Sequence, residues 1–162
     1  MRIAQQFIII FSSLLSLLIL NQRSSAETII PSKNYDLYIS KGIIEFDAGR
    51  YDKAKTEIEK ALAERHDDPD GNYYLGLIYL ELGRLKDAED RLKRVIEQEP
   101  SYQGAHYQLG VVYYKQGALN DALTAFSDAE KREPPRGMIY YYQGLIYHKQ
   151  GNYDKTPPLF LK

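Results

Sequence analysis

The side chains best suited to chemistry in this sequence are three histidines and one acidic run. His66, His106 and His148 could bind a metal or transfer protons, but they are far apart in the chain, without carboxylates or cysteines at ligand spacing. The run 67–70, Asp-Asp-Pro-Asp, offers oxygen ligands but lacks the further spaced oxygens of a calcium loop. We interpret it as a polar linker between helices, and we predict no metal site.

Catalytic motifs are absent as well. The sequence has no phosphate-binding loop with its lysine, no HExxH and no GxSxG. We therefore predict no enzyme activity and no cofactor. The chain carries 21 basic and 22 acidic residues, a net charge of −1, so it has no broad positive field to hold phosphates. Nucleic acid is excluded as an expected partner.

The N-terminal segment 1–26 differs in composition from the rest. Arg2 precedes an uncharged apolar run over 7–20, and residues 24–26 (Ser-Ser-Ala) are small, as at signal-peptidase sites. The run is shorter than the roughly 20 residues that span a bilayer. We expect a signal peptide over 1–26 and a periplasmic or secreted product with no membrane contact; the alternative is an uncleaved N-terminal anchor. The chain has no cysteine, which excludes disulfides and lipid attachment at a cysteine.

Small residues recur in columns along the remaining chain. When the sequence is compared with a shifted copy of itself, these small residues align at one constant spacing, which is the spacing between Gly42 and Gly76. The columns are Gly42, Gly76, Gly110 and Gly144; Gly49, Gly83, Gly117 and Gly151; and Ala54, Ala88, Ala122 and Thr156. Such a register over four copies is typical of a repeat protein.

Each period predicts two helices. Over 73–82 apolar residues recur at helical spacing without proline, and Gly83 stands where a helix needs a left-handed residue to end. From Leu85 apolar residues return at steps of three and four until Pro100. Glycine inside a helix costs roughly 1 kcal/mol, so a glycine that recurs there needs a packing reason. We therefore predict that the two paired helices approach each other closely at the small columns.

These columns resemble those of tetratricopeptide repeat (TPR) proteins, here of an exported bacterial type, over about 35–162. The repeat unit of that family is about 34 residues long. The matching residues are Leu75-Gly76 and Leu109-Gly110, Tyr79 and Tyr113, Ala88 and Ala122, Leu92 and Phe126, and Pro100 and Pro134. The family's tryptophan is replaced by Tyr38, Asn72, His106 and Tyr140. The resemblance implies an all-α fold, a right-handed superhelical α-solenoid of helix-turn-helix repeats, with three full repeats and one incomplete.

The repeat register also predicts the domain limits. They are a signal peptide over 1–26, a linker over 27–34, repeats over 35–68, 69–102 and 103–136, and an incomplete repeat over 137–162. In that last copy Thr156-Pro157-Pro158 interrupts the second helix. Part of its first helix, about 137–150, would then be uncovered. We expect a partner or a second copy of the chain to cover it, or the chain to be a truncated product of a longer gene.

In the family, one stripe of each first helix lines a concave groove that receives a peptide or partner segment. Carried to this chain, the stripe predicts a partner-binding groove, called the predicted groove below. Its residues are Tyr73, Leu77, Leu80, Tyr107, Val111, Tyr114, Lys115, Tyr141, Leu145, His148 and Lys149. Tyrosines suit binding because they offer large amphipathic contacts with few rotatable bonds. For any single tyrosine, packing between repeats is the alternative.

These features together predict a noncatalytic adaptor or scaffold of the cell envelope that binds a protein or peptide partner. Docking of chaperone tails is not supported, since the family's carboxylate clamp needs Lys and Asn where this chain has Tyr, Ile, Leu and Val. The alternative function is a structural module that forms homo-oligomers through the uncovered last helix.

Overall fold

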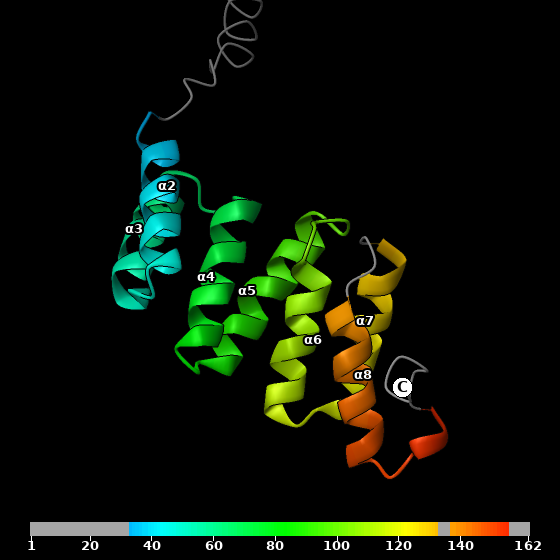
Figure 1. The fold of residues 1–162 in the computed structure, drawn as a ribbon. Coiled ribbons are helices and arrows are strands. Elements are labelled where there is room, and N and C mark those ends of the chain that lie inside the picture. The colour runs from blue at the N-terminus through cyan, green and yellow to red at the C-terminus, as the bar shows by residue number, and fades with distance from the viewer. Residues whose placement is uncertain (1–32, 133–136, 156–162) are drawn as a thin grey trace, which may run out of the picture. The chain divides into compact units, whose positions relative to one another are not determined.

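A computed structural model describes residues 33–132 and 137–155, and the described residues from Asn34 onward belong to one compact unit. The described residues form α-helices and one short 3₁₀ helix, with no strand among them (Figure 1). In chain order these are α2 (Lys33–Asp47), α3 (Tyr51–Glu64), α4 (Pro69–Glu81), α5 (Leu85–Gln98), α6 (Ala105–Gln116), α7 (Leu119–Arg132), α8 (Gly137–Lys149) and η1 (Tyr153–Lys155). The all-α repeat solenoid expected from the sequence is confirmed.

The helix ends follow the second glycine column. Gly83 after α4 and Gly117 after α6 have φ values of +72° and +80°, the left-handed region that glycine enters without steric cost. The backbone N–H of Gly83 donates to the carbonyl of Leu80 at 3.2 Å, which satisfies one of the free carbonyls at the end of α4. The chain then turns and enters α5 at Leu85.

Members of the other two small columns lie between the helices of the pairs α4–α5 and α6–α7. A Cβ atom added to Gly76 would lie 3.0 Å from Cγ of Leu92 on α5. The next repeat is tighter, since the same atom on Gly110 would lie 2.6 Å from Cε1 of Phe126 on α7. Ala88 and Ala122 are fully buried. The small residues therefore allow the close approach that the sequence predicts.

Neighbouring repeats stack through both of their helices. Within pairs, α4 packs on α5 and α6 on α7; between pairs, α3 packs on α4, α5 on α6 and α7 on α8. The first helices also contact one another, α4 with α6 and α6 with α8, and Figure 1 shows these three side by side. A residue position that recurs once in every repeat therefore forms a row across adjacent helices.

Three expectations fall wholly or mostly outside the described residues. They are the signal peptide over 1–26, the linker over 27–34 and the Thr156-Pro157-Pro158 interruption. Within 33–132 and 137–155, no helix is long and apolar enough to cross a membrane.

Candidate protein-binding surface

The structure distributes the predicted groove over α4, α6 and α8 at three depths. Lys115, Tyr141, His148 and Lys149 are exposed, and Tyr73, Leu77, Tyr107, Tyr114 and Leu145 are half-buried. Leu80 and Val111 are only 5% exposed and belong to the hydrophobic core. These two side chains pack the repeats and present little area to a partner.

The tyrosines of the predicted groove also contact their neighbours. The Tyr73 ring lies 5.0 Å from the Tyr102 ring, centroid to centroid. The Tyr107 ring lies 5.9 Å from Phe126 and 6.4 Å from Tyr142 of the next repeat. Packing within the protein therefore accounts for part of each of these two rings, and for Tyr107 it includes packing between repeats, the alternative from the sequence. The Tyr141 ring meets the Tyr142 ring at 5.7 Å between centroids, but 42% of the Tyr141 surface is exposed.

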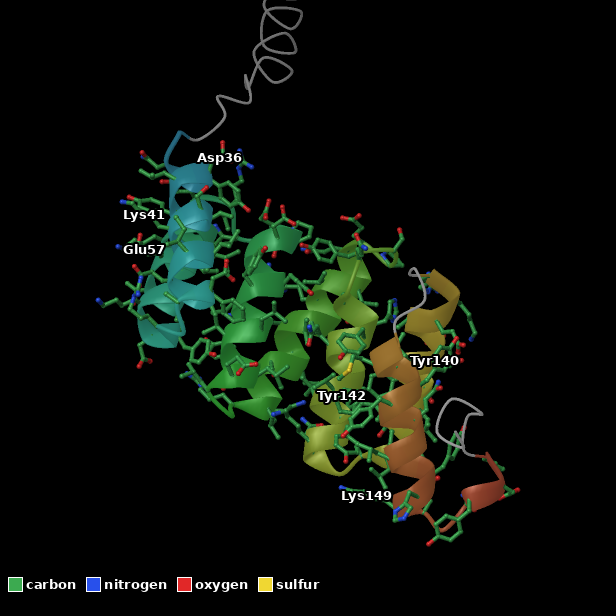
Figure 2. The ribbon with its side chains drawn as sticks, viewed as in Figure 1. Asp36, Lys41, Glu57, Tyr140, Tyr142 and Lys149 are labelled. Atoms are coloured by element: carbon green, nitrogen blue, oxygen red, sulfur yellow. The ribbon has the colours of Figure 1, made fainter. Side chains whose placement is uncertain are left out.

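Tyr142 is the centre of an aromatic cluster that the sequence did not single out. Its ring stacks on Phe126 of α7 with centroids 5.4 Å apart and planes 14° apart. It also meets Tyr114 of α6 at 5.2 Å, and Figure 2 labels Tyr142 on the side of α8 that faces α6. Burial raises the pKa of Tyr142. This cluster joins α8 to the preceding repeat and gives the end of the predicted groove an aromatic floor.

Two lysines add positive charge to that end. Lys149 of α8 reaches back over the Tyr114 ring, with its Nζ 4.7 Å from the ring centroid. A cation in this position is attracted by the electron-rich ring face. Lys115 is exposed near the end of α6. Figure 2 labels Lys149 near the end of α8.

The acidic run 67–70 has structural roles. The Asp68 carboxylate accepts a hydrogen bond from the backbone N–H of Gly71 at 3.2 Å, which caps α4, and it also accepts one from the Tyr35 hydroxyl. Asp70 accepts a hydrogen bond from the Tyr102 hydroxyl at 2.6 Å. Burial and this hydrogen bond raise the pKa of Tyr102. The run thus holds α4 to Tyr35 of the preceding repeat and to the segment that follows α5.

The histidines have separate surroundings. His106 is buried in the column of the family tryptophan, with Nε2 2.9 Å from the carbonyl oxygen of Pro100. His148 is exposed, and its ring lies 5.3 Å from the Tyr153 ring. Across 33–132 and 137–155, no group of three His, Asp or Glu residues is placed to hold a metal ion.

Two buried polar networks were not predicted from the sequence. Asn72, fully buried, donates from Nδ2 to the Asp68 carbonyl at 2.9 Å and accepts at Oδ1 from Arg91 of α5 at 3.0 Å. Glu89 of α5 accepts from Lys93 at 2.7 Å and from Gln116 of α6 at 3.0 Å. The one sequence signal for these hydrogen bonds is a change of residue type. Asn72, a polar residue, stands where the family has tryptophan.

Two surface depressions of the described residues lie away from the predicted groove residues. One of about 470 Å³ lies between α2 and α3 and is lined by Ile44, Lys41 and Glu57 among others. Figure 2 labels Lys41 and Glu57 on the side of this first repeat that faces away from α4. Another, of about 380 Å³, is lined by α5, α6 and α7 residues such as Ile96 and Tyr113. The predicted groove residues line neither depression.

Comparisons with solved structures identify the same fold. A thermophilic TPR protein of Thermus thermophilus, TTC0263, is 29% identical with a TM-score of 0.66, over 75% of this chain and 69% of that one. MamA from Desulfovibrio magneticus RS-1 is 23% identical with a TM-score of 0.73, over 80% and 73%. The first TPR of Spaghetti (RPAP3), bound to the HSP90 peptide SRMEEVD, is 19% identical with a TM-score of 0.70, over 74% and 95%.

Sequence profiles give the family. Residues 45–103 match one profile described as tetratricopeptide repeat, and residues 76–134 and 107–160 match a second with the same description. No curated protein matches the chain. The second profile alone spans more than half of the sequence, and the two profiles together cover the consecutive helix pairs α4–α5 and α6–α7. The chain belongs to the tetratricopeptide repeat family.

Proposed function

We propose that this chain is a noncatalytic adaptor or scaffold of the cell envelope that binds a segment of a partner protein along the predicted groove. The observation that carries the proposal is the row of equivalent side chains across α4, α6 and α8. Tyr73, Tyr107 and Tyr141, exposed or half-buried, recur there at the same helical position, on helices that contact one another. A second position holds the half-buried Leu77 and Leu145, with the buried Val111 in the repeat between them. Such a row offers repeated contacts to one extended chain.

The TPR family supports binding of protein segments as the general activity. The Spaghetti TPR, which shares this fold, is described as bound to a peptide. The envelope location has separate support, the apolar run 7–20 and the small residues 24–26. The proposal of an envelope location is therefore independent of the proposal of a binding surface.

Affinity capture from envelope extract with the mature protein tests the function. The informative variant is Leu77→Asp with Leu145→Asp, because both leucines are half-buried on first helices and an introduced charge opposes burial under a ligand. The matched control is Ile44→Asp, on α2 outside the predicted groove and 61% exposed. We expect the double variant to lose the partner and the control to keep it, with equal helical circular dichroism. Loss in the control alone would move the site to the outer face of α2.

A structural oligomerisation module is the second candidate. It is favoured by exposed apolar residues on α8, where Met138 and Tyr141 are 50% and 42% exposed. Light scattering separates the two functions. A monomer at high concentration contradicts the oligomerisation module, and an oligomer that Met138→Asp dissociates supports it.

A further inference from the structure

Each first helix ends with a charged residue at the same repeat position. These residues are Asp47, Glu81, Lys115 and Lys149, each one repeat period after the last, and we call them the charged column. All four are exposed. Asp47, Glu81 and Lys149 are the last residues of α2, α4 and α8, and Lys115 is the penultimate residue of α6. The column therefore runs from two negative charges to two positive charges.

The two acidic members oppose the helix dipole. The C-terminal end of a helix carries partial negative charge, which favours Lys or Arg there and disfavours Asp or Glu by about 0.3–1 kcal/mol. Lys115 and Lys149 satisfy this preference, whereas Asp47 and Glu81 do not. Helix stability therefore does not explain the change of sign along the column.

The charged column is not neutralised within the described residues. The ion pairs of 33–132 and 137–155 join other side chains, mostly three or four residues apart on one helix. Lys149 lies over the Tyr114 ring, and no carboxylate of the described residues forms an ion pair with it. The four charges are thus available to a ligand, and Glu81, Lys115 and Lys149 lie on helices that contact one another, as do the half-buried Leu77, Tyr114 and Leu145.

We propose that the predicted groove and its charged column bind an extended peptide segment of opposite polarity, with carboxylates over α6 and α8 and amines over α2 and α4. Packed helices lie about 8–10 Å apart, and an extended chain advances about 3.3 Å per residue, so each repeat takes about three residues. The segment is then about ten residues long, with apolar side chains in its middle. This inference rests on the proposed function and adds the direction of the bound segment. Complementary charge sets specificity and orientation in this way.

The test uses two synthetic ten-residue peptides with blocked ends and the same composition. The first carries two lysines at one end, two glutamates at the other, and leucine and alanine between them; in the second the four charges are interleaved. We expect fluorescence anisotropy to give a dissociation constant at least about tenfold lower for the first peptide. Equal affinity for the two peptides, or no binding of either, overturns the polarity.

Charge-swap variants give the orientation. Lys115→Glu with Lys149→Glu should weaken binding of the first peptide about tenfold or more, and so should Asp47→Lys with Glu81→Lys. All four changes together should restore affinity, because the column is then reversed at unchanged net charge. A spin label on the acidic end should broaden amide signals of α8 in the wild type and of α2 in the fourfold variant. Lys53→Glu, exposed on α3, is the control and should have no effect.

Other outcomes are distinguishable. If the fourfold variant stays weak, or the label broadens the same helix in both proteins, the polarity is wrong. If affinity capture of the partner still depends on Leu77 and Leu145 in that case, the proposed function survives although the polarity of the segment is wrong. A charged column of this kind would also match a second copy arranged antiparallel. If light scattering shows a dimer, and either double charge-swap variant dissociates it, the occupant of the charged column is that second copy and not a peptide.

Discussion

Gly110 of α6 lies directly against the ring of Phe126 of α7. A Cβ atom at position 110 would lie 2.6 Å from Cε1 and 2.7 Å from Cδ1, and the ring is fully buried. It is also held by stacking on Tyr142, so it has little room to move. We therefore predict that Gly110→Ala lowers the free energy of unfolding by about 1–3 kcal/mol through overpacking.

Gly137→Ala is the matched control. A Cβ atom at Gly137, the first residue of α8, meets nothing within 4 Å. We expect this variant to be as stable as the wild type or up to about 1 kcal/mol more stable. Urea melts of both variants check the pair. Equal stabilities would show that α6 and α7 do not approach as described.

Asn72 and Arg91 should depend on each other. Removing the Arg91 side chain leaves Oδ1 of the fully buried Asn72 without this partner, which costs about 1–3 kcal/mol. In a double-mutant cycle of Asn72→Ala and Arg91→Ala, we expect a coupling free energy above about 0.5 kcal/mol. Strictly additive losses would mean that the hydrogen bond contributes nothing to stability.

Glu89 should make the free energy of unfolding depend on pH in the acid range. Burial raises the pKa of Glu89, but hydrogen bonds from Lys93 and Gln116 and the charges of Lys93 and Lys86 outweigh burial and lower it. The ionised form therefore stabilises the fold above the unfolded pKa, about 4.3, and this stabilisation is lost as the pH falls through the lowered folded pKa. Glu89→Gln should be less stable than the wild type near neutral pH, and the difference should vanish in strong acid. Asp90→Asn, exposed on the same helix, should change little. A difference between Glu89→Gln and wild type that is constant with pH contradicts this assignment.

Export should remove the segment 1–26. We predict cleavage after Ala26, because small residues precede that bond and an apolar run lies before them. Intact-mass analysis of the exported protein should show a chain beginning at Glu27. Membrane-bound material that retains Met1 would instead show an N-terminal anchor.

The helix ends and the close contacts could be predicted from the sequence because glycine and alanine report local geometry. Gly83 and Gly117 mark left-handed helix ends, and Gly110 marks the contact with Phe126. The burial of Leu80 and Val111 could not be predicted, since periodicity gives the face of a helix but not how deeply a neighbouring repeat covers it. The hydrogen bonds between helices could not be predicted either. Arg91 lies 19 residues from Asn72, and Gln116 lies 27 residues from Glu89, so helical periodicity gives no information about these pairs.

The structure also changes which variants are informative. Tyr107 packs on Phe126 and Tyr142, so Tyr107→Ala would remove core contacts together with any ligand contact. Leu77 and Leu145 are half-buried and absent from that aromatic cluster. A loss of binding at these two positions is therefore easier to assign to the surface.

Site-specific photo-cross-linking tests the binding surface most directly. A photoreactive amino acid is placed at position 77 or 145 in the predicted groove, or at position 44 on the outer face of α2, and the protein is irradiated in envelope extract. We expect the same cross-linked partner from positions 77 and 145 and none from position 44. A partner cross-linked from position 44 but from neither 77 nor 145 would contradict binding along the predicted groove.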